Sequence, residues 1–127
     1  MSADVYAAEA KERWGETEAY KESQRRTKNY TEADWQESQN EAEHAVALFV
    51  AAMESGLAPS SDEAMAAAEA HRQHINRWFY PCSYDMHTGL ASMYLADSRF
   101  TEHYEKYAVG LAQFVHDAIY ANAVHNS

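Results

Sequence analysis

The sequence predicts an all-α fold, and three observations carry that prediction. The chain has 127 residues with only four glycines and two prolines, which leaves few places to turn. Alanine and glutamate are abundant whereas valine, isoleucine and threonine are sparse, a composition that favours helices over strands. Apolar residues recur at spacings of three and four, the period of a helix with one buried face. We therefore expect a bundle of crossing helices with a cleft.

Composition and charge narrow the class of protein. A chain of this length forms one domain with its own core. The formal net charge of −10 argues against direct nucleic-acid binding, because phosphate binding needs clustered Lys and Arg. We find neither a long apolar run nor a basic N-terminus followed by one, so we expect no membrane span and no secretion signal. The single cysteine cannot form an internal disulfide, which favours a reducing, cytoplasmic setting.

Two short and weak helix candidates begin the chain. Residues 4–14 lack a convincing apolar stripe, and they end at Trp14. The second candidate follows Gly15 and carries Tyr20 as its bulky apolar residue. Isolated helices this short are marginal in water. We expect them to dock on the core or to form a lid that orders when a ligand binds.

Two longer helices are predicted next. The sequence TEAD from Thr31 resembles a capping box, and the helix after it has an apolar face formed by Trp35, Ala42, Val46, Phe49, Val50 and Met53. Ser60 with Glu63 predicts a second capping box, which opens a helix from about residue 62 to residue 79. The apolar face of that helix holds Met65, Ala68, Ile75 and Trp78 or Phe79.

The chain is organised around a corner at Pro81. Proline disfavours helix in the residue before it, so the preceding helix should end near Tyr80. Ser83 is a good N-cap for a new helix that buries Met86, Leu90, Met93 and Tyr94. Cys82 would then lie at the positive end of this helix, where the helix dipole favours a thiolate.

Two helices complete the predicted bundle. Asp97 or Ser98 caps a short helix that contains Phe100 and Tyr104, and Gly110 interrupts it. The last helix has a clear apolar face formed by Leu111, Phe114, Val115, Ala118, Ile119 and Asn122.

Cys82 and the histidines near it in the sequence allow three interpretations. The first is a reactive thiol, activated by the helix N-terminus or by a protonated His71, His74 or His87, that adds to an electrophile on a ligand. The second is a zinc site, although the spacing of these residues is generic. The third is a small buried side chain, which residue types alone favour. No obvious cluster of oxyanion donors accompanies the thiol, so we do not expect an enzyme.

Seven separated motifs occur in order along the chain: residues 14–20, 30–35, 80–87, 93–94, 97–100, 110–111 and 117–119. Together they resemble the TipA-type antibiotic-binding domain (TipAS), the effector domain of a group of MerR-like transcription regulators. The resemblance implies a globin-like helical fold without haem or another cofactor. It also implies a loosely held, flexible N-terminal helical lid over residues 1–30 and an antibiotic-binding core over residues 31–127.

The resemblance also implies a ligand. The best-known members bind thiopeptide antibiotics such as thiostrepton in a hydrophobic cleft, and a cysteine in the position of Cys82 adds to a dehydroalanine of the antibiotic. This mechanism requires an accessible thiol beside an apolar groove. We expect the macrocyclic ligand to contact Trp14, Tyr20, Trp35, Phe49, Met53, His71, Trp78, Phe79, Tyr84, Met86 and His87.

Two alternatives remain open at this point. Other members of the family bind different hydrophobic natural products without covalent attachment, and Cys82 would then be inert. A metal- or redox-responsive regulator domain would instead use Cys82 and the histidines. No helix-turn-helix is apparent in the sequence, so we expect the chain to sequester a drug or to be fused to, or derived from, a DNA-binding regulator.

Overall fold

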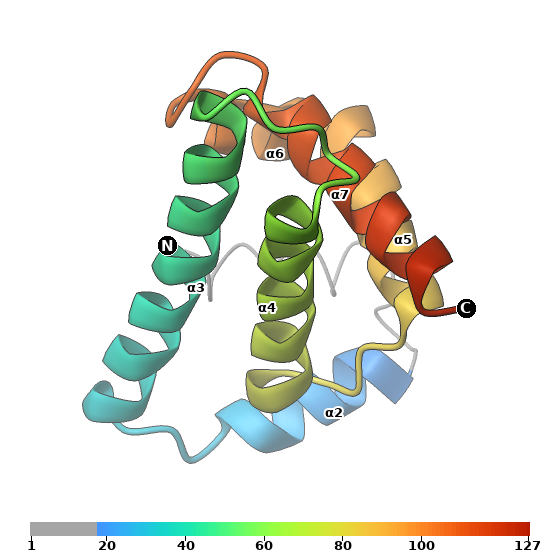
Figure 1. The fold of residues 1–127 in the computed structure, drawn as a ribbon. Coiled ribbons are helices and arrows are strands. Elements are labelled where there is room, and N and C mark those ends of the chain that lie inside the picture. The colour runs from blue at the N-terminus through green and yellow to red at the C-terminus, as the bar shows by residue number, and fades with distance from the viewer. Residues whose placement is uncertain (1–17) are drawn as a thin grey trace.

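Six α-helices make up the part of the chain that this computed structural model describes, residues 18–127 (Figure 1). They are α2 (Glu18–Thr27), α3 (Glu32–Glu54), α4 (Asp62–Trp78), α5 (Tyr84–Ala96), α6 (Ser98–Glu105) and α7 (Leu111–His125). This range contains no β-strand, so the prediction of an all-α fold is confirmed. Within it, no helix combines the length and the apolar character needed to cross a bilayer. The first helix candidate and Trp14 lie outside the described residues.

Helix α4 lies at the centre of the fold. It runs antiparallel to α3 on one side and packs against α7 on the other (Figure 1). Helix α7 also covers α5, and the short α6 joins these two helices at one end of the bundle. Helix α2 contacts α4 near its C-terminal end. The helices therefore cross around a shared core, as the apolar spacing predicts.

The core is formed by the predicted faces of the long helices. Its largest fully buried apolar side chains are Phe49, Ile75, Phe79, Tyr80, Leu90, Tyr94, Leu111 and Ile119. Small residues of α4, among them Ala64, Ala67 and Ala68, are also completely buried and let neighbouring helices approach closely. Met86 is only partly buried, so it lies at the edge of the face on which it was predicted.

The caps confirm one sequence signal and correct another. Thr31 caps α3 as predicted: its hydroxyl accepts from the Asp34 amide at 3.1 Å, and the Asp34 carboxylate accepts from the Thr31 amide at 3.0 Å. The predicted capping box of Ser60 with Glu63 is wrong. Ser61 is the N-cap of α4, and its hydroxyl accepts from the Ala64 amide. Adjacent serines offer the same capping group, so the signal alone leaves the helix start uncertain by one residue.

Asp97 caps the start of α6 through the Arg99 amide, as predicted.

The connection from α6 to α7 is fixed by the carboxylate of Glu105. At the other end of α6, the two carboxylate oxygens of Glu105 accept from the amides of Gly110 and Ala112 at 2.8 and 2.9 Å. Gly110 has a φ of 90°, a left-handed conformation that favours glycine. The loop between the two helices is therefore held at both ends.

Candidate functional site

The connection between α4 and α5 forms the predicted corner. Helix α4 ends at Trp78, and Phe79 leaves helical geometry with a φ of −121°. Ser83 is the N-cap of α5, and its hydroxyl accepts a 3.1 Å hydrogen bond from the Met86 amide. Cys82 directly precedes this cap, so its predicted place at the start of a new helix is confirmed.

Two side chains of α4 hold the backbone of Cys82. The Cys82 amide donates to Oδ1 of Asn76 at 2.9 Å, and Nη1 of Arg72 donates to the Cys82 carbonyl oxygen at 2.7 Å. Arg72 and Asn76 are four residues apart, so they lie on one face of the helix. They satisfy backbone groups that have no helical partner at this break. The corner is thereby fixed to α4 rather than left as a free loop.

Glu69 is the acceptor on which this arrangement depends. Its carboxylate accepts from Nη2 of Arg72 at 2.6 Å, from the Tyr84 hydroxyl at 3.0 Å and from Nδ2 of Asn122 at 3.0 Å. Burial alone would raise the pKa of Glu69, but these hydrogen bonds outweigh it and lower the pKa to about 2. The Arg72 guanidinium also stacks 4.2 Å above the centre of the Tyr84 ring. One carboxylate thus joins α4, α5 and α7 beside Cys82.

The structure corrects the expectation of an open thiol. Cys82 is 1% exposed, and its sulfur lies 3.8 Å from the carbonyl oxygen of Ser83. An electrophile on a large ligand has no access to a sulfur at this degree of burial. The third sequence interpretation, a small buried side chain, describes Cys82 in this conformation.

A pair of buried histidines lies in the core between α4 and α5. Nδ1 of His71 and Nε2 of His87 are 2.8 Å apart, and the two rings stack. The Tyr104 hydroxyl lies 3.4 Å from Nε2 of His71. Burial lowers the pKa of His71 well below its ordinary value and that of His87 to about 3. Both rings are therefore neutral near pH 7, so neither supplies the protonated histidine that the first interpretation invokes.

The predicted aromatic contacts separate into two groups. Trp35 and Trp78 surround Tyr30, whose hydroxyl donates to the Trp78 carbonyl oxygen at 2.5 Å. Phe79 lies 6.4 Å from Trp35, measured between ring centres. Phe49 belongs to the second group and packs against His71 in the core. Trp35 also lines a hollow of about 520 Å³ on the first turns of α3.

The remaining predicted contacts vary in exposure. Tyr20, Met53, Tyr84 and Met86 are partly exposed, whereas Phe49, His71, Trp78, Phe79 and His87 are buried. Their contact with a ligand stays a prediction. The sequence reasoning missed Glu69, Arg72 and Asn76 as parts of the site. The sequence does offer one signal for Arg72 and Asn76: both are polar residues on the last turns of a helix that ends before a proline, where they can bind the backbone that follows.

The zinc interpretation finds no ligand set in the described part of the chain. Nδ1 of His74 lies 3.4 Å from a carboxylate oxygen of Glu41, while His71 pairs with His87. Among residues 18–127, no group of three or more His, Cys, Asp or Glu side chains is placed to hold a metal ion.

Comparison with known proteins adds sequence relatives. The family profile of the TipAS antibiotic-recognition domain matches residues 6–122. The chain is 48% identical over 124 residues to the HTH-type transcriptional activator TipA of Streptomyces coelicolor, and equally to that of Streptomyces lividans. It is 35% identical over 115 residues to the HTH-type transcriptional activator mta of Bacillus subtilis. The match to TipA covers 98% of this chain and 49% of TipA, and the match to mta covers 91% of this chain and 44% of mta. This chain therefore spans about half the length of these relatives.

Two solved structures share the fold. One is a complex of nosiheptide with TipAS from Streptomyces lividans, a thiopeptide antibiotic multidrug resistance system. It is 46% identical and superposes with a TM-score of 0.87, covering 100% of this chain and 89% of the other. The second is the antibiotic-binding domain of a TipA-class multidrug resistance transcriptional regulator. It is 47% identical with a TM-score of 0.66, covering 73% of this chain and 99% of the other.

Proposed function

This chain belongs to the family of TipAS antibiotic-recognition domains, and from that premise we propose that it binds thiopeptide antibiotics as a drug-sequestering or drug-sensing module. The observation that carries the proposal is the similarity over the whole chain to a TipAS protein in complex with nosiheptide. We propose a binding role without catalysis, in the cytoplasm, and a physical or evolutionary link to a DNA-binding regulator. The relatives that are named HTH-type activators are about twice as long, which supports that link.

We place the antibiotic against the Cys82 corner and the lid that includes α2. A chain of contacts supports this placement. Nη1 of Arg26 on α2 donates to the Asn76 carbonyl oxygen at 2.6 Å, and the side chain of the same Asn76 accepts from the Cys82 amide. Tyr30, three residues after the end of α2, donates to the carbonyl oxygen of Trp78. A displacement of residues 18–30 therefore removes contacts that hold the end of α4 and the corner. In this proposal, the displacement exposes the thiol.

The covalent step is a simple addition. The Cys82 thiolate forms a carbon–sulfur bond to the terminal carbon of a dehydroalanine, and the carbon next to the carbonyl takes up a proton. Nothing leaves, so the adduct mass equals the sum of protein and antibiotic. The thiol must first become accessible, and residues 1–30 must then close over the ligand. Closure over the ligand costs conformational entropy, which a covalent bond offsets by preventing dissociation.

Intact-mass spectrometry after incubation with nosiheptide or thiostrepton tests the proposal. We expect one antibiotic added to the wild-type chain and none covalently added to Cys82→Ala. Retained non-covalent binding by Cys82→Ala would confirm that the cleft forms without the thiol. If neither antibiotic binds to either protein, thiopeptide capture is wrong. If both proteins bind equally without any adduct, the domain is a non-covalent sensor.

A pair of arginine variants tests the opening of the corner. Arg26→Ala removes the contact with Asn76 and should increase the rate at which a small maleimide labels Cys82 by roughly tenfold, the effect of losing one charge-assisted hydrogen bond. Arg25→Ala is the matched control, because Arg25 is exposed and forms its ion pair with Glu22 on the same helix. Equal labelling rates in the two variants would contradict the link between α2 and the thiol. Slower amide exchange of residues 1–30 on antibiotic binding would support the lid.

A further inference from the structure

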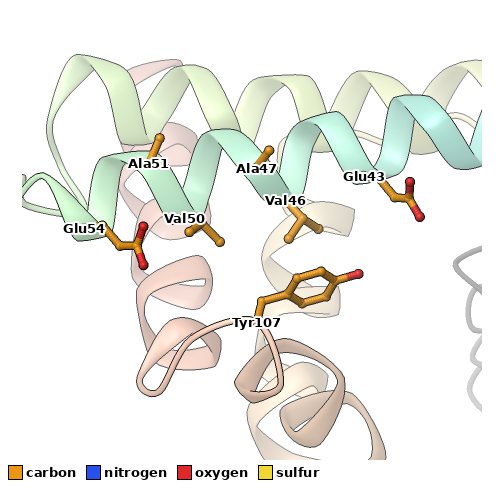
Figure 2. A pocket seen from close by; sticks show the side chains of 7 residues that line it. All are labelled: Glu43, Val46, Ala47, Val50, Ala51, Glu54 and Tyr107. Atoms are coloured by element: carbon orange, nitrogen blue, oxygen red, sulfur yellow. The ribbon is translucent and has the colours of Figure 1, made fainter.

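A second hollow lies between the C-terminal half of α3 and the connection from α6 to α7 (Figure 2). These elements meet at the opposite end of the molecule from the connection between α4 and α5 that carries Cys82 (Figure 1). It is an open groove of about 410 Å³, and its lining consists of Glu43, Val46, Ala47, Val50, Ala51, Glu54 and Tyr107. From this groove we propose a second ligand site, which takes an elongated, apolar molecule with a positive charge at each end.

The spacing along α3 gives the groove its character. The lining residues follow one another at steps of three and one, so they form a continuous stripe along one side of the helix. Glu43 and Glu54 are the charged members and stand at opposite ends, with valine and alanine between them. Glu54 follows Glu43 by eleven positions, which corresponds to about 16 Å along the helix axis.

The two carboxylates are available to a ligand. Within residues 18–127, neither Glu43 nor Glu54 takes part in a salt bridge. Glu43 accepts a 3.3 Å hydrogen bond from the amide of Gln39, which carries no charge to balance that of the carboxylate. Both residues are exposed, so a cation could reach them without breaking an ion pair within residues 18–127. Charge complementarity therefore favours a dication over a neutral or anionic occupant.

Tyr107 forms the opposite wall of the groove. Figure 2 shows its ring facing Val46, with the two carboxylates at either side. Tyr107 is 43% exposed, so its side chain is accessible to a ligand in the groove. Glu105 holds the loop that follows Tyr107 through the backbone amides of Gly110 and Ala112. The wall is thus present before a ligand arrives, as is typical of small-molecule sites.

Two basic residues near Tyr107, Lys106 and His103, affect how a cation would bind in the groove. Nζ of Lys106 lies 5.6 Å from the centre of the Tyr107 ring, so its positive charge competes with a ligand cation for this ring. His103 also contacts Tyr107, but burial and the charge of Lys106 lower its pKa to about 4, so it is neutral near pH 7. Removing the charge of Lys106 should therefore tighten the binding of a dication.

The test uses bis(trimethylammonium)alkanes with hexane, decane and tetradecane chains as probes, followed by amide chemical shifts and calorimetry. We expect the decane dication to bind more tightly than the hexane dication, than decyltrimethylammonium and than decanediol. The shifted amides should belong to residues 43–54 and 104–110. Glu43→Gln and Glu54→Gln should each weaken binding roughly fivefold, the factor given by an exposed ion pair of about 1 kcal/mol.

Two further variants complete the test. Lys106→Gln should strengthen binding. Asp85→Asn removes one negative charge, as Glu43→Gln does, but at the other end of the molecule, and it should leave binding unchanged. Binding that is insensitive to Glu43→Gln and Glu54→Gln would overturn the proposal, as would shifts confined to other helices. If none of the dications binds but an amphipathic helical peptide with lysine at each end shifts the same amides, the groove docks a helix and the small-molecule proposal is wrong.

Discussion

His87 provides the sharpest prediction about stability, because it is an ionisable side chain buried without charge. Burial, reinforced by the positive charge of Arg72, lowers its pKa from 6.5 to about 3. The unfolded chain restores the ordinary pKa and takes up a proton below it, whereas the folded protein does not. The stability that depends on neutral His87 is therefore complete above about pH 6.5, and it is lost progressively as the pH falls towards about 3.

The size of this loss of stability follows from the pH range over which only the unfolded chain binds the proton. Each pH unit below the ordinary pKa costs about 1.4 kcal/mol, so His87 alone should lower the free energy of unfolding by about 2 kcal/mol between pH 7 and pH 5. Urea unfolding followed by circular dichroism at both pH values measures this decrease. In His87→Gln the decrease should be smaller by about 2 kcal/mol, although the loss of the hydrogen bond to His71 lowers stability at both pH values.

The control for this experiment is His44→Gln. His44 is an exposed histidine on α3, so its replacement should leave the pH dependence of the wild type unchanged. An equal decrease in stability for His87→Gln and the wild type would refute the reasoning, because the buried histidine would then not be the group that titrates on unfolding.

Three further predictions concern stability at pH 7 and use the same urea assay. Glu69→Gln should cost about 1–2 kcal/mol, because the largely buried Arg72 loses its charged partner; an unchanged midpoint would show that the pairing contributes nothing. Gly89→Ala and Gly110→Ala should change stability in opposite directions, although both glycines have open space for the new methyl group. Gly89→Ala should stabilise the protein by about 0.5–1 kcal/mol, because alanine favours the helix α5. Gly110→Ala should destabilise it by about 1 kcal/mol, because the φ of Gly110 is positive. Ser83→Ala should cost about 1 kcal/mol through loss of the α5 cap, and equal stability would show that the cap is redundant.

The sequence predicts those parts of the fold that depend on neighbouring residues. Thr31 caps α3 and Ser83 caps α5 because a hydroxyl at these positions reaches an amide three residues later. The face of α7 from Leu111 to Asn122 is buried as its spacing predicts. Each of these features involves residues within a few turns of one another. Local geometry therefore suffices to identify them.

The parts that the sequence does not predict depend on residues far apart in the chain. His71 and His87 are 16 residues apart, and nothing in the spacing indicates that their rings meet. Asn122 joins Glu69 across 53 residues. The burial of Cys82 is set by how α4, α5 and their neighbours pack, so a pattern that correctly places the cysteine at a helix start says nothing about access to its sulfur.

The break at Pro81 is the basis of our proposal that docking of α2 and access to the thiol belong to one equilibrium. A helix that stops leaves backbone groups without partners, and at this corner Asn76 and Arg72 supply them to Cys82. Asn76 is also the residue to which Arg26 attaches α2. A ligand shifts such an equilibrium only by the difference between its affinities for the two states. An antibiotic that reacts with Cys82 must therefore bind the open corner more tightly than the closed one, and its non-covalent affinity must already include the cost of releasing Asn76.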